Sequence, residues 1–225
     1  MKSVCSEMQN SLRSFYFDCT HNITNIMNNR QAGYLGAMNI VSFNYTTVFD
    51  TLFNHVFPSS ISAPTILHIH GILGDDPIFG VDNESQLNVG YAITNNLRRA
   101  FIKPYFNNYY DKQRVLDFES LILSSNTICT YGLSLGDSDM HWRNTLLSWL
   151  GKSSENHLFI YDYRYFNKEY IVLSQKLAIE DAAKIDLLSS WGIEPSNDLL
   201  EQIHIPIGKH LFNISPYLKK HIQTT

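Results

Sequence analysis

Residues 130–142 read Thr-Tyr-Gly-Leu-Ser-Leu-Gly-Asp-Ser-Asp-Met-His-Trp, and this stretch predicts the fold of the whole chain. The residues that lead into it, 127–131, form a short, uncharged run rich in β-forming side chains, which favours a buried strand. Gly132 and Gly136 then bracket a turn. A turn of this kind gathers free backbone N–H groups, so it can hold a phosphate or lie under a ribose.

A helix is predicted to follow this turn. The residues at 137–139, Asp-Ser-Asp, are all good N-caps, and apolar side chains recur at helical spacing along residues 140–150. A strand, a glycine turn and a helix start are the arrangement at which open α/β sheets bind ligands. A tight turn that needs glycine for a positive φ angle explains the same residues without any ligand. Two other stretches of the sequence favour the ligand-binding alternative.

The length of the chain indicates one α/β domain over residues 1–225, because 225 residues can bury a full core. A helical insertion is expected over about residues 82–125. The dense basic cluster within it is interpreted as a solvated helix face, and it consists of Arg98, Arg99 and Lys103.

Charge and cysteine content exclude several classes of partner. A net charge of −4 gives no electrostatic reason to expect nucleic acid or a membrane surface. Three cysteines without paired spacing predict neither a disulfide framework nor a zinc knuckle. No apolar run reaches membrane-spanning length, so we expect a cytoplasmic protein.

Apolar periodicity predicts alternating strands and helices. The predicted strands are residues 38–43, 65–70, 127–131, 157–161 and 202–207. The predicted helices are residues 6–30, 48–56, 112–124, 140–150 and 167–191, the last of them broken once. This alternation is typical of a mostly parallel sheet covered by helices on both faces. We therefore expect a three-layer, Rossmann-like α/β fold.

Polar groups stand at the carboxyl ends of three predicted strands. Asn44 follows the first strand, His70 ends the second, and the 132–139 turn follows the third. In a parallel sheet these ends lie on one edge, so the three groups would face one crevice. His68 and His70 are two residues apart, so we expect both on one strand face, with His70 beside Asn44 and His68 deeper.

These groups suit attack at a sugar carbon. A histidine can act as a base near neutral pH, and an asparagine can orient a water or hold a sugar hydroxyl. An oxocarbenium-like transition state needs a positioned nucleophile with a base or dipole nearby. Each residue also has a structural explanation: Asn44 as a helix cap, His70 as a buried, hydrogen-bonded histidine, and Ser134 as part of the turn.

A metal-dependent hydrolase is a further alternative. Imidazole and carboxylate groups that bind divalent metals and activate water are supplied by His68, His70, Asp137, Asp139 and His141. No HExxH or similar helical pair of ligands occurs, so we predict no metal site.

Three motifs resemble the AbiH family of bacteriophage abortive-infection proteins. They are Ser-Phe-Asn-Tyr-Thr-Thr-Val-Phe-Asp at 42–50, Leu-His-Ile-His-Gly at 67–71, and Gly-Leu-Ser-Leu-Gly-Asp-Ser-Asp at 132–139, with a His-Trp pair shortly after. The resemblance covers roughly residues 35–165. AbiH proteins in turn look like distant sirtuin-like domains. In those domains an Asn at a strand end and a His-Gly pair serve cleavage of the glycosidic bond of NAD, and a Gly-x-Ser turn holds the dinucleotide.

The resemblance implies an anti-phage protein with a sirtuin-like nucleotide site that binds and cleaves NAD. Asn44 and His70 would be its catalytic residues. The residues implied in cofactor binding are Tyr45, Thr46, Gly71, Gly132, Ser134, Leu135, Asp137 and Asp139. The cysteine set that binds zinc in deacetylating sirtuins does not occur in the sequence, so protein deacetylation is not expected.

The sequence departs from the family pattern at its start. Family members usually begin with a strand and a Gly-Asn-Gly-Phe-Asp-like turn, whereas a predicted helix comes first here. We therefore expect a sheet that is incomplete on its N-terminal side, which weakens the case for catalysis. The alternative is a non-catalytic module of the same defence system, which senses a nucleotide or a phage component or forms a homo-oligomer.

Overall fold

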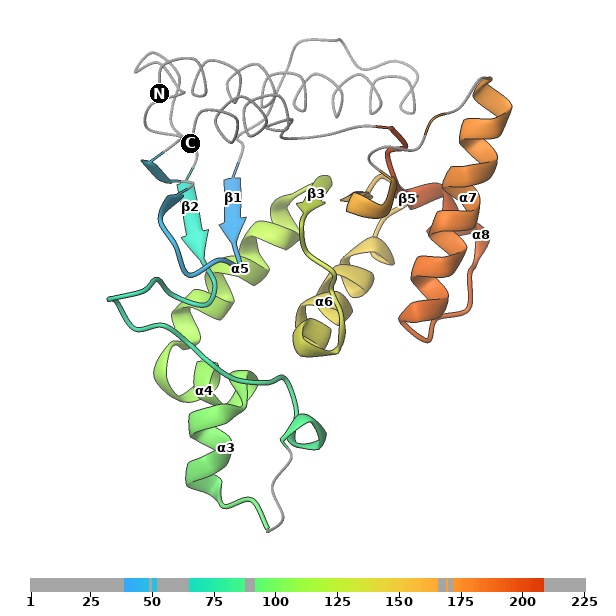
Figure 1. Ribbon diagram of the computed structural model, residues 1–225. Helices are drawn as coiled ribbons and strands as arrows, with labels where there is room; N and C mark the ends of the chain where they lie inside the picture. The colour runs from blue at the N-terminus through green and yellow to red at the C-terminus, as the bar shows by residue number, and fades with distance from the viewer. Residues whose placement is uncertain are drawn as a thin grey trace, which may run out of the picture.

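The computed structural model of the 225-residue chain (Figure 1) describes residues 39–48, 50–51, 65–87, 92–165, 169 and 172–208. Strands and helices both occur across these ranges, and the described strands pair in parallel. The prediction of a mixed α/β protein with parallel strands is confirmed. The helix predicted at 6–30 and most of the one predicted at 48–56 lie outside the described residues.

The described strands form two parallel sheets. In the first sheet, β1 (Asn39–Ser42) pairs with β2 (Thr65–His68). The second sheet has the order β3-β4-β5, with β3 (Thr127–Tyr131), β4 (His157–Tyr161) and β5 (Ile203–His204). We expected one sheet, but among the described residues no ladder of hydrogen bonds joins these two.

One hydrophobic core receives side chains from both sheets. Ile69, directly after β2, belongs to the same buried cluster as Leu135 after β3 and Ile160 in β4. All five residues of β4 are buried. A parallel strand covered on both faces requires such a continuous apolar sequence. The two sheets are therefore packed together although they share no ladder within the described ranges.

Helices cover this core. They are α3 (Asn95–Phe101), α4 (Lys103–Tyr110), α5 (Lys112–Ser124), α6 (Met140–Leu150), α7 (Leu173–Ser190) and α8 (Asn197–Gln202), with the 3-10 turns η1 (Glu84–Gln86), η2 (Asp137–Asp139) and η3 (Tyr163–Tyr165). The helices predicted at 112–124 and 140–150 are confirmed as α5 and α6. Figure 1 shows β1 and β2 pointing toward the end of the molecule that carries α3 and α4.

The C-terminal elements differ from the prediction. α7 runs without interruption over Leu173–Ser190. The strand predicted at 202–207 is reduced to β5, because α8 continues to Gln202. The alternating isoleucines are nevertheless buried, as their spacing predicts: Ile203, Ile205 and Ile207. Among the helices of the described ranges, none combines the length and the apolar character needed to span a bilayer.

The strand predicted at 65–70 ends early, at His68. The backbone turns here: the N–H of Gly71 donates to the carbonyl of His68 at 3.1 Å, and Gly71 has a φ angle of +70°. A Cβ atom on Gly71 would overlap the carbonyl oxygen of Asp76, so only glycine fits. Because His70 lies beyond the end of the strand, the expectation that it shares a strand face with His68 is wrong.

Candidate functional site

His70 lies in the turn after β2 and is 4% exposed. Its Nε2 atom is 3.7 Å from Oδ1 of Asp139, an ion-pair distance that is too long for a hydrogen bond. The ring meets Phe43 edge-on at 5.3 Å and stacks on Tyr45 at 6.0 Å between centroids. Its Nδ1 atom is buried and has no hydrogen-bond partner among the described residues. Buried polar atoms without partners are uncommon, so His70 is the first candidate for contact with a ligand.

Asp139 connects the turn after β3 to His70 and to the insertion. Its Oδ1 atom lies 3.3 Å from Nζ of Lys103, the first residue of α4, and the two side chains are only 14% and 10% exposed. Burial raises the pKa of Asp139, but the contacts with His70 and Lys103 outweigh it and hold that pKa below its usual value. Asp139 is therefore ionised at neutral pH, and Lys103 balances its charge.

Asp82 is a second buried carboxyl group in the same region. One of its oxygens accepts the backbone N–H of His141 at 2.9 Å, in the first turn of α6. Burial raises the pKa of Asp82 above its usual value and the charge of Asp139 adds to this, although the N–H of His141 and the charge of Lys103 oppose it. Two carboxyl groups with pKa values shifted in opposite directions therefore lie at the start of α6, an arrangement that can separate acid and base roles.

The start of α6 is not capped by the Asp-Ser-Asp residues at 137–139 in the way that the sequence predicted. Asp139 occupies the N-cap position, but its side chain makes no capping hydrogen bond. Its carboxylate lies instead against Lys103 and His70. Asp82, from a distant part of the chain, satisfies the N–H group that a cap would satisfy. The structural role first given to Asp139 therefore belongs to Asp82.

The three basic residues of the insertion have separate partners. Arg98 pairs with the glutamate that opens η1, and Arg99 lies over a tyrosine ring of α4 at 4.4 Å. Lys103 is buried, so the interpretation of this cluster as a solvated helix face is wrong for Lys103. Sequence reasoning missed both Lys103 and Asp82. A signal existed for Asp82, because it follows an extended apolar segment just as the predicted site residues follow strands.

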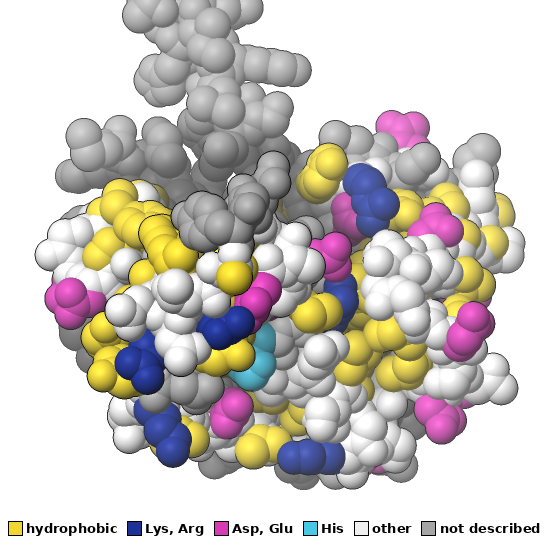
Figure 2. Space-filling model, turned by 90° about the horizontal axis from the view of Figure 1, so that it is seen from below, with side chains coloured by type: hydrophobic (Ala, Val, Ile, Leu, Met, Phe, Trp, Pro, Cys, Tyr) yellow, Lys and Arg dark blue, Asp and Glu magenta, His cyan; other side chains and the backbone are white. Residues whose placement is uncertain are grey.

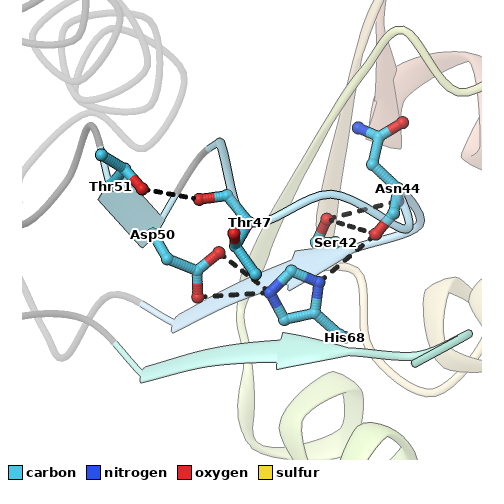
Figure 3. Close-up of polar contacts among 6 residues, drawn as sticks. All are labelled: Ser42, Asn44, Thr47, Asp50, Thr51 and His68. Carbon is cyan, nitrogen blue, oxygen red and sulfur yellow. Dashed lines mark hydrogen bonds and ion pairs between the residues drawn. The ribbon is translucent and has the colours of Figure 1, made fainter. Parts of the chain in front are cut away.

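His68, and not His70, contacts Asn44 (Figure 3). Its Nδ1 atom donates to the backbone carbonyl of Asn44 at 3.3 Å, and its Nε2 atom lies 3.0 Å from the carboxylate of Asp50. Oγ of Ser42 accepts the N–H of Asn44 at 3.3 Å. The exposed side chain of Asn44 points away from the His68 ring in Figure 3. The predicted pairing of Asn44 with His70 is therefore not among the contacts that the described residues make.

The turn at 132–139 has an open part and an anchored part. Gly132 has a φ angle of +65°, and a Cβ atom there would meet nothing within 4 Å, so it borders open space, and Ser134 is exposed. Leu135 is buried in the core with a φ angle of +49°, which is uncommon for a residue with a side chain. Its carbonyl accepts a hydrogen bond from Arg143 at 3.3 Å. Only the backbone of Leu135 can therefore face a ligand.

The remaining residues implied in nucleotide binding differ in how far they are exposed to solvent. The Tyr45 hydroxyl donates to a backbone carbonyl at 2.8 Å, and burial, helped by the charge of Asp139, raises the pKa of Tyr45. Gly71 is buried, whereas Thr46 is exposed and the Asp137 side chain is 85% exposed. Tyr45 is thus the member of this set that touches His70.

We define the His70 cluster as His70, Asp139, Lys103, Asp82 and Tyr45. Its histidine has one nitrogen toward a carboxylate and the other without a partner, which is the arrangement of a general base and its orienting acid. Figure 2 shows a face of the molecule, seen from below, on which acidic, basic and hydrophobic side chains lie next to one another. Within the described ranges, His, Cys, Asp and Glu form no group of three or more that could hold a metal ion.

Comparison with known proteins supports the resemblance of the motifs. The sequence model described as "Bacteriophage abortive infection AbiH" matches residues 1–161, which is more than half of the chain. No curated protein and no solved structure matches. The matched range includes all three motifs and every member of the His70 cluster. The chain belongs to the AbiH family.

Proposed function

We propose that this chain acts in bacteriophage abortive infection through a sirtuin-like nucleotide site at the His70 cluster, where it cleaves the glycosidic bond of NAD. Membership of the AbiH family implies the role in abortive infection. One observation carries the proposal for the site: His70, after β2, meets Asp139, after β3, and keeps a buried Nδ1 atom without a partner among the described residues. Because β2 and β3 lie in different described sheets, the two residues meet where the sheets pack on their shared core, and not at one edge of a single sheet.

The groups of the cluster fit a hydrolytic reaction. With Nε2 of His70 turned to Asp139, Nδ1 can accept the proton of a water that attacks the ribose carbon. The C–N bond of NAD breaks as the water attacks, nicotinamide leaves with the bonding electrons, and the water oxygen stays on the ribose carbon. Open space beside Gly132 and the exposed Ser134 leave room for the rest of the dinucleotide along the turn. Asn44, with its side chain directed away from His68, would hold a ribose hydroxyl.

The strand pattern supports a sirtuin-like, three-layer arrangement as part of this proposal. β1 pairs only with β2 and β3 only with β4 among the described ladders, and all pairs are parallel. Both sheets contribute to one core. A doubly wound sheet, in which ligands bind at the carboxyl edge, would contain parallel pairs of this kind.

The test is to incubate the purified full chain with NAD and to measure the release of nicotinamide by chromatography. We expect release by the wild type and a loss of about 10²–10⁴-fold in rate for His70→Gln, as for removal of a general base. His68→Gln is the matched control, since it changes the neighbouring histidine. If the wild type neither binds NAD nor releases nicotinamide, the proposal is wrong.

A second candidate, a non-catalytic nucleotide-sensing module, is favoured by the burial of the cluster. His70, Asp82 and Lys103 are each less than a tenth exposed, which limits the approach of a substrate. This candidate predicts that NAD binds without nicotinamide release. A metal-dependent hydrolase lacks a suitable group of ligands within the described residues, and metal analysis of the purified protein tests it directly.

A further inference from the structure

An exposed aromatic ring is joined to the His70 cluster by stacked rings. Phe79 is 57% exposed, and its ring stacks on Tyr45 at 4.9 Å between centroids with an interplanar angle of 30°. Tyr45 in turn stacks on His70 at 6.0 Å and 29°. A single exposed phenylalanine on a protein surface needs no explanation. Contact with the site through two near-parallel rings is what separates Phe79 from such a residue.

The backbone around Phe79 is fixed on both sides. On one side the N–H of Ile78 donates to the carbonyl of His70 at 2.8 Å. On the other, the N–H of Val81 donates to the carbonyl of Phe101 at 2.9 Å, and a Cβ atom on Gly80 would overlap that same carbonyl. The segment therefore cannot move inward to bury the Phe79 ring, and the ring is held in position before any ligand arrives.

The same segment also leads to the cationic part of the cluster. The N–H of Lys103 donates to the carbonyl of Val81 at 2.8 Å, two residues after Phe79. Lys103 lies against Asp139, which faces His70. The contacts therefore run inward from the exposed Phe79 ring through Tyr45 to His70. From His70 they continue through Asp139 to Lys103. A ligand that carries a planar base and a sugar phosphate offers matching groups.

We propose that the outer face of Phe79 stacks on the aromatic base of a nucleotide whose ribose lies toward His70. This inference rests on the proposed nucleotide site and adds its base-recognition residue. One face of the Phe79 ring is covered by Tyr45, and the exposed fraction leaves surface for a second planar ring. Stacking does not distinguish one base from another, so Phe79 selects ligands that contain a base over those that lack one.

The experiment measures binding of four probes by calorimetry: NAD, nicotinamide mononucleotide, adenosine monophosphate and ribose 5-phosphate. The proteins are the full wild-type chain, Phe79→Ala, Phe79→Trp and Tyr110→Ala, in which an aromatic residue on α4 with 63% exposure is removed as a control. Circular dichroism and thermal melting confirm that each variant is folded. An exposed side chain such as Phe79 contributes little to stability, so Phe79→Ala is expected to fold.

The expected result is about tenfold weaker binding of base-containing probes to Phe79→Ala, restored by Phe79→Trp, with Tyr110→Ala like the wild type. Binding of ribose 5-phosphate should be the same in all four proteins. Equal binding of NAD to the wild type and Phe79→Ala overturns the role of Phe79 and leaves the nucleotide site standing. Absence of any binding to the wild type overturns the site itself, and the role of Phe79 with it.

Discussion

His68 and His70 are separated by one residue, yet their surroundings differ. His68 ends β2, and both of its ring nitrogens have partners, the carbonyl of Asn44 and the carboxylate of Asp50. His70 lies beyond the strand, and its Nδ1 atom has no partner among the described residues. A histidine with two satisfied nitrogens holds a loop in place, whereas a buried nitrogen without a partner can receive a ligand. The hydrogen-bond partners of the two rings distinguish these histidines, whereas their spacing in the sequence does not.

The carboxylates beside the two histidines differ in their exposure to solvent. The Asp50 side chain is 33% exposed and the Asp139 side chain 14% exposed. Asp139 also balances the charge of Lys103, which is largely buried. Exposed ion pairs contribute little to stability, while removal of one partner from a buried pair leaves a charge without compensation. The region around His70 therefore depends more strongly on its charges.

The largest effect is expected for His70→Gln, which should lower activity toward NAD, or protection against phage, by about 10²–10⁴-fold. The substitution removes the base and keeps a polar side chain of similar size. Glutamine is chosen because His70 is buried against Phe43 and Tyr45, so truncation to alanine would open a cavity.

His68→Gln completes this comparison. It should lower activity by less than about tenfold, far below the loss expected from removing a base, because it affects the site only through the position of Asn44. Protection assays in infected cells, together with nicotinamide release, measure both variants. Equal losses for the two histidines would show that they do not have different roles.

The next effect concerns stability. Asp139→Asn should lower the free energy of unfolding by up to about 3–5 kcal/mol, because it removes the carboxylate that lies 3.3 Å from the buried ammonium of Lys103. Asp50→Asn should lower it by less, because the Asp50 side chain is one-third exposed and solvent screens its contact with His68. Urea denaturation at pH 7 measures both. Restoration of stability by a second substitution, Lys103→Met, would confirm that loss of the Asp139–Lys103 pair is the cause.

A smaller effect is expected at the start of α6. Asp82→Ala removes the acceptor for the N–H of His141 and should cost about 1 kcal/mol, as loss of a helix cap does. Asp82→Asn keeps an acceptor oxygen and removes a charge that burial disfavours, so it should cost less. Thermal melting of the two variants measures which substitution lowers the stability more. A larger loss for asparagine than for alanine would contradict the capping role.

The smallest effect is the dependence of stability on pH. The pKa of Asp139 is lower in the folded chain than its usual value of about 3.9, so the unfolded chain binds more protons in acid. Its stabilisation is complete above about pH 5 and is lost as the pH falls below about 4. Asp139→Asn should flatten the stability profile between about pH 5 and 3. Denaturation curves at several pH values test this.

Local patterns predicted much of the fold. β3, α5, α6 and β4 lie where apolar periodicity places them, because these elements bury continuous or evenly spaced apolar side chains. The sequence also indicated His70 and the 132–139 turn, which the structure brings together through Asp139. The helices, the strands and these site residues could be predicted because each follows from residues that are close together in the sequence.

The rest depends on distant contacts that spacing does not reveal. β2 ends at His68 because the backbone at Gly71 lies against Asp76. Lys103 is buried because Asp139, from 36 residues further along, reaches it. Asp82 caps α6 from 59 residues before His141. Charged residues at such positions look like surface residues until their partners are known.

We propose that His70, and not His68, meets the ligand. Nitrogen-15 NMR of the histidine rings in the full chain, with and without NAD, tests it most directly, and the variants His70→Gln and His68→Gln assign the two sets of signals. We predict that NAD shifts the Nδ1 signal of His70 and leaves both nitrogen signals of His68 unchanged. A shift confined to His68, or no shift of either histidine at saturating NAD, would contradict the claim.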